Sequence, residues 1–147
     1  MSNLEPIIIL LADDDEDDCF LIKEAFEESR ISNDLQYVND GEELMDYLLN
    51  RGNYEDKAKH PKPDLILLDL NMPRKNGKEA LKEIKENQEL RKIPVVVLTT
   101  SEAEEDIIKT YDLGVNSFIT KPVSFDGLVE VVKALGKYWF QIVKLPK

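Results

Sequence analysis

Five short apolar runs, separated by segments of helical periodicity, constrain the fold of this chain more than any other feature. The runs span residues 7–12, 35–38, 65–68, 94–98 and 117–119. The segments between them carry apolar residues three or four positions apart, so strands and helices are expected to alternate. Near-continuous apolar runs are typical of parallel strands that are buried on both faces. The sequence therefore predicts an α/β fold, with a doubly wound five-stranded parallel sheet and helices on both faces.

The segments between the runs differ in character. Three of them are predicted to be helices that pack on the sheet, through faces formed by Cys19, Ile22, Ala25 and Phe26, by Leu44, Tyr47 and Leu48, and by Ala80, Leu81 and Ile84. Residues 50–63 are polar and aperiodic, so they are predicted to form a long loop. The single histidine, His60, lies in that loop without the neighbours of a metal or phosphoryl-donor site, and a surface position is expected.

The length and charge of the chain argue against several classes of protein. The chain has 147 residues, the size of one domain, and 30 acidic against 19 basic residues give a net charge of -11. Such a surplus of acid opposes binding to nucleic acid, whose phosphates select clustered lysine and arginine. The lone Cys19 cannot form an internal disulfide, and neither a membrane helix nor a signal peptide is visible. A cytoplasmic protein that binds neither nucleic acid nor membrane is expected.

Polar residues follow four of the five apolar runs. Asp13 and Asp14 follow the first run, Asp69 the third, Thr99 the fourth and Lys121 the fifth. In a doubly wound sheet, ligands bind beyond the carboxyl ends of the strands where the strand order reverses, so the three carboxylates are expected to meet there. A hard divalent cation would relieve their mutual repulsion, and Mg²⁺ is the natural choice. A phosphoryl group on Asp69 would be stabilised by the Thr99 hydroxyl and the Lys121 ammonium.

The acidic run at residues 13–18 has two other interpretations. Acidic residues in a first helical turn each contribute about 0.3–1 kcal/mol, which accounts for residues 15–18. The run could also belong to a calcium-binding EF-hand loop, with ligand positions 1, 3, 5 and 12 filled by Asp13, Asp15, Asp17 and Glu24. That loop needs glycine at its sixth position, where this chain has Asp18, and the preceding run is typical of a strand. The EF-hand match is therefore attributed to chance.

An acid pair, an acceptor aspartate, a threonine and a lysine-proline pair, each after its own strand, resemble the pattern of response-regulator receiver domains from two-component signalling. The resemblance covers roughly residues 6–135. It implies that Asp69 is the phosphoacceptor and that Asp13, Asp14 and Asp69 bind Mg²⁺. It also implies that Thr99 and Lys121 contact the phosphoryl group. A sensor histidine kinase or a phosphotransfer protein would supply that group.

The same resemblance adds finer expectations. The backbone carbonyl of Asn71 would be a further metal ligand, and Phe118 would turn inward as Thr99 moves toward the phosphate. Met72-Pro73 and Gly77 match the family's turn after the acceptor, where glycine can adopt a conformation open to few other residues. The fold would be that of a flavodoxin-like receiver, with the sheet order 2-1-3-4-5 and an extended C-terminal helix and tail.

Within this family, the chain resembles the small single-domain regulators that pair with phytochrome-type histidine kinases. The similarity lies in the loop 50–63, the stretch 98–107 and the ending 139–146. Similar regulators accompany other kinases, so a phytochrome-type kinase is one candidate partner. Thr100 replaces a smaller residue that is common in the family, and its branched side chain would narrow the path of water to an acyl phosphate. Slow autodephosphorylation is therefore expected.

The C-terminal end carries an apolar seam. The seam consists of Leu128, Val132, Leu135, Trp139 and Ile142. These residues are spaced by four, three, four and three positions, which places them on one face of a helix. A helix that covers the sheet accounts for the seam only as far as Leu135, and an exposed apolar patch beyond it is typical of an interface. A homodimer through the last helix and tail is expected, with an interface at Leu135, Trp139, Phe140 and Ile142. Alternatively, Gly136 ends the helix and the tail folds back over the domain.

One receiver domain at 1–147 is therefore expected, with a core at about 6–135 and a C-terminal extension at 136–147. Its leading function is to accept phosphate on Asp69 and to signal by conformational change and contact, without enzymatic turnover. The first rival is a phosphohydrolase of the haloacid-dehalogenase type, but that family needs a second aspartate where this chain has Asn71. The second rival is a receiver-like interaction domain that is never phosphorylated. The intact set of functional side chains argues against it.

Overall fold

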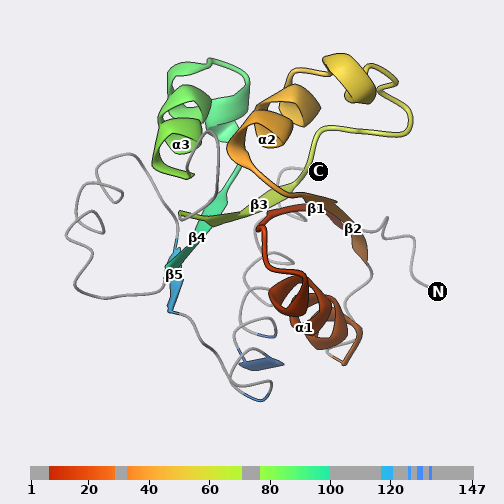
Figure 1. The fold of residues 1–147 in the computed structure, drawn as a ribbon, viewed down its shortest axis with the longest axis vertical. Coiled ribbons are helices and arrows are strands. Elements are labelled where there is room, and N and C mark those ends of the chain that lie inside the picture. The colour runs from red at the N-terminus through yellow and green to blue at the C-terminus, as the bar shows by residue number, and fades with distance from the viewer. Residues whose placement is uncertain are drawn as a thin grey trace, which may run out of the picture.

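A computed structural model describes residues 7–28, 33–70, 77–99 and 117–120, together with residues 126, 129, 130 and 133; of residues 33, 99 and 117–120 it describes the backbone only. Parallel strands form one sheet in the order β2-β1-β3-β4-β5 (Figure 1). The strands are β1 (Ile7–Ala12), β2 (Asn33–Val38), β3 (Leu65–Asp69), β4 (Val95–Thr99) and β5 (Ser117–Thr120). The predicted C-terminal extension at 136–147 lies outside these residues.

Helices cover both faces of the sheet, as the apolar periodicity predicted. α1 (Glu16–Glu28) lies on one side, and α2 (Gly41–Leu48) and α3 (Gly77–Glu86) lie on the other (Figure 1). Alternate strand residues point to opposite faces, so Leu10 and Ile66 join the core under α2 and α3, whereas Ile9 and Leu67 join the core under α1. Every apolar side chain predicted for the three helix faces is buried. The α/β class and the doubly covered parallel sheet are confirmed.

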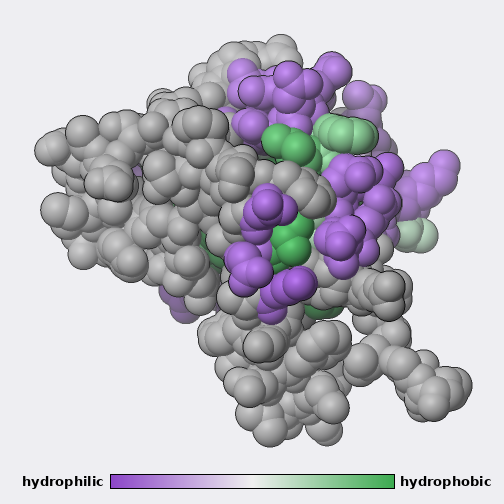
Figure 2. All heavy atoms as spheres, turned by 90° about the horizontal axis from the view of Figure 1, so that it is seen from below, coloured by the Kyte–Doolittle hydropathy of each residue, from purple (hydrophilic) through white to green (hydrophobic). Residues whose placement is uncertain are grey.

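The described surface is consistent with an acidic, water-facing chain. The described residues that are visible in Figure 2 are mostly hydrophilic, with a few hydrophobic side chains between them. Among the described residues, the large exposed hydrophobic side chains are Phe20, Tyr37 and Leu49. Tyr37 belongs to β2, which lies at one edge of the sheet. The helices described here are all too short or too polar to cross a membrane.

The segment 50–63 has more structure than the sequence predicted. It contains a short 3-10 helix, η1 (Gly52–Tyr54), and the rings of Tyr47, Tyr54 and His60 pack together with centroids 4.9–5.5 Å apart. The Tyr47 hydroxyl donates to the Pro61 carbonyl oxygen at 2.9 Å, and the Asn50 side chain donates to two carbonyl oxygens of the segment. His60 is only partly exposed. The sequence did not predict the contacts of its ring with Tyr47 and Tyr54, because they come from tertiary packing.

The buried phenol of Tyr47 links the stability of this segment to pH. Burial, followed by the negative charge of Asp34, raises the pKa of Tyr47 from 10.0 to about 12. A phenol whose pKa is higher in the folded state stabilises the fold below the unfolded value, and this contribution disappears as pH rises through the folded value.

We expect Tyr47→Phe to lower the free energy of unfolding by about 1 kcal/mol at pH 7, because the hydrogen bond to Pro61 is lost. The variant should also lose less stability than the wild type above about pH 10, where the unfolded phenol ionises. Urea unfolding at neutral and alkaline pH measures both effects. Tyr37→Phe, at an exposed position, is the control. Equal stability of Tyr47→Phe and the wild type at pH 7 would contradict the role given to the hydroxyl.

Candidate functional site

Three carboxylates lie together where β1 and β3 end. Asp13 directly follows β1 and Asp69 is the last residue of β3, and these strands are neighbours, with Ala12 opposite Leu68. Asp14 lies beside them, and one carboxylate oxygen of each aspartate lies within 4.8 Å of the others. The chain runs from β1 to β2 on one side and returns to β3 on the other, so this is the point where the strand order reverses.

Backbone hydrogen bonds hold Asp13 in place. Its N–H donates to the Val38 carbonyl oxygen at 3.1 Å, which extends the pairing of β1 with β2. Its carboxylate accepts from the Asp15 N–H at 2.9 Å, which ties the side chain to the start of α1. The thiol of Cys19 donates to the Asp13 carbonyl oxygen at 3.8 Å and is buried in the core under α1, as expected of a packing residue. Asp13 is fully buried.

Close packing with the start of α3 holds the backbone at Asp69. The Gly77 N–H donates to the Leu70 carbonyl oxygen at 3.0 Å, and the Leu70 N–H donates to the Leu98 carbonyl oxygen at 3.1 Å. A Cβ atom on Gly77 would overlap the Asp69 carbonyl oxygen and would lie 2.5 Å from the Leu70 Cα atom. Among the described residues, only Asn50 and Gly52 have a positive φ. Gly77 is therefore required for space, and the conformational reason expected from the sequence is wrong.

The site has the charge and the donor atoms of a site for a hard cation. Asp13 is fully buried and Asp69 is 2% exposed, so two carboxylates are largely removed from water next to the exposed Asp14. Buried carboxylates are costly unless positive charge compensates them. A donor set made of oxygen atoms suits Mg²⁺, Mn²⁺ or Ca²⁺. The three aspartates therefore fit a divalent cation.

The EF-hand interpretation fails on the local structure. Residues 16–28 form one continuous helix that follows a strand, whereas an EF-hand loop would keep Asp17 and Glu24 within an open loop that follows a helix. Asp17 and Asp18 lie in the first turn of α1, where negative charge is favourable.

Other predicted site residues are described only in part. The backbone of Thr99 ends β4 and lies opposite Thr120 of β5, and Phe118 lies within β5. The side chains of Thr99 and Phe118 lie outside the described part of the chain. So do Asn71, Lys121 and the expected interface residues Leu135, Trp139, Phe140 and Ile142.

Comparison with known proteins gives the same family by sequence and by structure. Residues 9–133 match the family model of the response regulator receiver domain. Response regulator Rcp1 of Synechocystis sp. is 43% identical over 141 residues, which cover 96% of this chain and 94% of Rcp1. The crystal structure of the phosphorylated cyanobacterial phytochrome response regulator RcpA has a TM-score of 0.82 and 44% identity, and covers 92% of this chain and 94% of its own.

The Mn²⁺-bound crystal structure of Rcp1 is also similar to this chain, with a TM-score of 0.80 and 43% identity over 91% of this chain and 94% of Rcp1. These similarities extend over almost the full length of both proteins. The strand order and the aspartates at the ends of β1 and β3 are consistent with them. The chain therefore belongs to the response regulator receiver domain family.

Proposed function

We propose that the chain accepts a phosphoryl group from a histidine kinase onto Asp69 and passes the signal on by conformational change and protein contact. One observation carries the proposal: Asp69 ends a central strand at the switch point of the sheet, beside Asp13 and Asp14. Membership of the receiver family implies a histidine kinase as the donor. A similar protein, RcpA, has been crystallised in its phosphorylated form.

The proposed transfer needs little covalent chemistry from the protein. A carboxylate oxygen of Asp69 attacks the phosphorus of a phosphohistidine, so that a P–O bond forms and the P–N bond breaks. The electron pair of the broken bond returns to the imidazole nitrogen of the donor. The chain contributes the position of the acceptor and the charges around it, which are the main sources of catalysis in phosphoryl transfer.

Asp13, Asp14 and Asp69 would hold the divalent cation, and the backbone carbonyl of Asn71 would complete the protein ligands. When bound, Mg²⁺ neutralises negative charge on the acceptor and on the phosphoryl oxygens. The Mn²⁺-bound structure of Rcp1 supports a divalent ion in a similar protein. Mg²⁺ itself is part of our proposal for this chain.

Thr99, Lys121 and Phe118 would form the switch. The Thr99 hydroxyl and the Lys121 ammonium would contact the phosphoryl oxygens, and Phe118 would turn inward. Phosphorylation shifts the equilibrium between two conformations of the protein. The shift cannot exceed the difference between the free energies with which the phosphoryl group interacts with the two conformations. Thr99 is the last residue of β4, which pairs with β3. Its backbone therefore lies, like Asp69, at the end of the sheet where the parallel strands have their C-termini.

The rival functions can be separated by trapping the product. After incubation with acetyl phosphate and Mg²⁺, borohydride should reduce an acyl phosphate at Asp69 to homoserine, and peptide mapping should find the change at that residue alone. Hydrolysis of p-nitrophenyl phosphate should not exceed the background rate. Sustained turnover of the ester would favour a phosphohydrolase, and an unmodified Asp69 would favour an interaction domain without phosphorylation.

We propose that Thr100 slows hydrolysis of the acyl phosphate. Thr100→Ala should shorten the half-life of the phosphorylated chain about tenfold if the branched side chain obstructs the attacking water, a change of about 1.4 kcal/mol in the barrier. Decay of the phosphorylated mass with time measures the half-life. An unchanged half-life would reject the obstruction.

We propose that residues 1–147 form one receiver domain, with a core at about 6–135 and a C-terminal extension at 136–147. We also propose that the chain resides in the cytoplasm and that it forms a homodimer through residues of the last helix and tail. The interface would include Leu135, Trp139, Phe140 and Ile142. Trp139→Glu should place a charge in this interface and give a monomer in sedimentation velocity, while Phe20→Glu on α1 should leave the dimer intact. A wild-type monomer, or a dimeric Trp139→Glu variant, would reject this interface.

The proposed partner is a phytochrome-type histidine kinase. RcpA is a cyanobacterial phytochrome response regulator, and the chain is similar to it over most of its length. Because the net charge of the chain is -11, its binding to nucleic acid is unfavourable. We therefore propose that the chain does not signal by binding nucleic acid directly.

A further inference from the structure

A cavity of about 410 Å³ opens at the end of the sheet where β3 begins, whereas the aspartate site lies where β3 ends. Its walls come from three places: the end of α2, the segment that precedes β3, and the short helix η2 (Leu90–Lys92) with the turn before it. This volume is within the usual range for pockets that bind small molecules.

Four apolar residues form part of the cavity lining: Leu48, Leu49, Pro61 and Leu90. Leu48 and Leu90 are buried members of the core under α2 and α3, and Pro61 is half-buried beside them. Leu49 is 39% exposed and is one of the few large hydrophobic side chains exposed among the described residues. An apolar group in the cavity would cover Leu49 and would gain free energy from the area removed from water.

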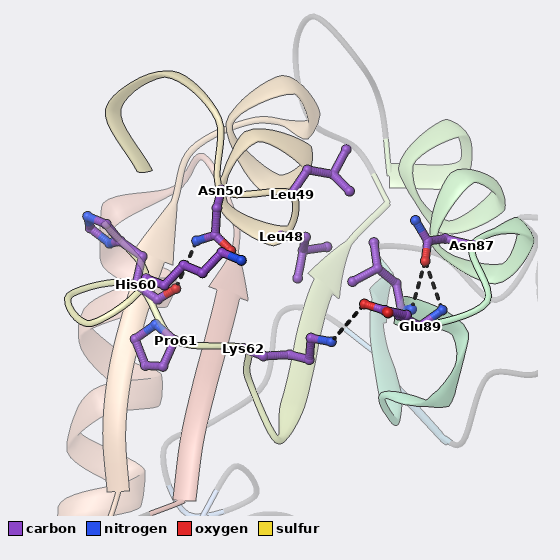
Figure 3. A pocket seen from close by; sticks show the side chains of 10 residues that line it. Leu48, Leu49, Asn50, His60, Pro61, Lys62, Asn87 and Glu89 are labelled. Carbon is purple, nitrogen blue, oxygen red and sulfur yellow. Dashed lines mark hydrogen bonds and ion pairs between the residues drawn. The ribbon is translucent and has the colours of Figure 1, made fainter. Parts of the chain in front are cut away.

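Hydrogen-bond donors dominate the rim. Among the described residues, no hydrogen bond or ion pair occupies the ammonium of Lys57. Lys62 reaches across the opening to Glu89 at 3.5 Å, and their side chains are 52% and 82% exposed (Figure 3). An ion pair of this length and exposure contributes little free energy. The Lys62 ammonium can therefore leave Glu89 and bind another anion at little cost in free energy.

Asn87 contributes a third donor with a fixed orientation. Its side-chain oxygen accepts from the N–H groups of Glu89 and Leu90 at 2.9 and 3.0 Å. The amide nitrogen therefore points away from those groups, as Figure 3 shows. This nitrogen can donate to a bound molecule without losing an internal hydrogen bond.

The wall built by the segment before β3 is held in place without a ligand. The Asn50 side chain donates to the carbonyl oxygens of Tyr54 and His60 at 3.0 and 3.1 Å, and the Tyr47 hydroxyl donates to Pro61. The ring of His60 points away from the centre of the cavity (Figure 3). It packs against the rings of Tyr47 and Tyr54. A wall that is already ordered lowers the entropic cost of binding.

We propose that this cavity binds a small organic anion with an apolar body, such as an aryl or alkyl carboxylate. The lining carries two lysines and one glutamate, a local surplus of one positive charge in a chain whose net charge is -11. This local surplus would attract an anion against the charge of the whole chain. The leucines would contact the apolar body, and Lys57, Lys62 and Asn87 would contact the carboxylate.

The test is a titration of the full chain followed by amide NMR, with phenylacetate as the probe and phenylacetamide as its neutral counterpart. Phenylacetate should shift the amides of Leu49, Asn50 and Asn87 in a saturable way, with a Kd of about 1 mM or tighter. Phenylacetamide should bind at least about fivefold more weakly, because it lacks the charge that the lysines recognise.

Matched variants locate the anion. Lys57→Gln and Lys62→Gln should each weaken phenylacetate about fivefold. Lys59→Gln, at an exposed position of the same segment outside the lining, should leave the affinity unchanged. All three positions are exposed, so the fold should persist in each variant. The proposal is overturned if no saturable shift occurs, if phenylacetamide binds equally well, or if the double variant of Lys57 and Lys62 retains full affinity.

Discussion

Gly77→Ala is expected to lower the free energy of unfolding by about 1–3 kcal/mol and to slow phosphorylation of Asp69 at least about tenfold. The added Cβ atom would overlap the Asp69 carbonyl oxygen and would lie 2.5 Å from the Leu70 Cα atom. Both neighbours are backbone atoms at the end of a central strand, and they cannot rotate away as a flexible side chain would. Relief of the overlap must move either α3 or Asp69, and the second movement separates its carboxylate from Asp13 and Asp14.

Urea unfolding measures the stability of this variant, and the rate of adduct formation with acetyl phosphate measures its function. Gly52→Ala is a matched control. Gly52 has a φ of 58°, so alanine there costs about 1 kcal/mol through backbone strain, but a Cβ atom at Gly52 would make only an ordinary contact, 3.8 Å from the Asp46 side chain. The control should keep the wild-type rate of phosphorylation. A Gly77→Ala variant with wild-type stability and rate would show that the close packing on Asp69 has no consequence.

The second large effect is expected from Asp13→Asn, which should remove most of the stabilisation that Mg²⁺ gives to the fold. A ligand at about 100 times its Kd stabilises the folded state by about 2.7 kcal/mol, and we expect this order of effect in the wild type. Asparagine keeps an oxygen that can accept from the Asp15 N–H, so the start of α1 should remain intact. It lacks the buried negative charge that attracts the cation.

Thermal unfolding with and without MgCl₂ measures this difference, and Asp17→Asn is the control. Asp17 lies in the first turn of α1, outside the group of three carboxylates, so its variant should respond to Mg²⁺ as the wild type does. An EF-hand would instead use Asp17 as a ligand and would prefer Ca²⁺. Equal stabilisation of the Asp13→Asn variant and the wild type by Mg²⁺ would contradict the proposed metal site.

The sequence predicts the strands, the helices and the way they pack, because these features follow from the local periodicity of apolar residues. Buried parallel strands need apolar side chains on both faces, and the runs that become β1, β3 and β4 have them. The faces of α1, α2 and α3 follow in the same way from apolar residues at helical spacing. The gathering of Asp13, Asp14 and Asp69 is also predictable, since the carboxyl ends of adjacent parallel strands share one edge.

Features that arise from packing between distant segments have no such local pattern. The rings of Tyr47, Tyr54 and His60 come from a helix, a 3-10 turn and a loop, so the periodicity of one element cannot predict that they meet. Gly77 is recognisable as a glycine of the turn after the acceptor, but its overlap with the Asp69 backbone depends on where α3 begins. The cavity beside Leu49 depends on how the segment before β3 lies against η2.

Intact-mass spectrometry after incubation with acetyl phosphate tests the central claim most directly, with and without Mg²⁺, on the wild type and on Asp69→Asn. We expect a single phosphoryl adduct on the wild type that forms only with Mg²⁺, and no adduct on Asp69→Asn. No adduct on the wild type under any condition, or an adduct of equal yield on Asp69→Asn, would contradict the assignment of Asp69 as the phosphoacceptor.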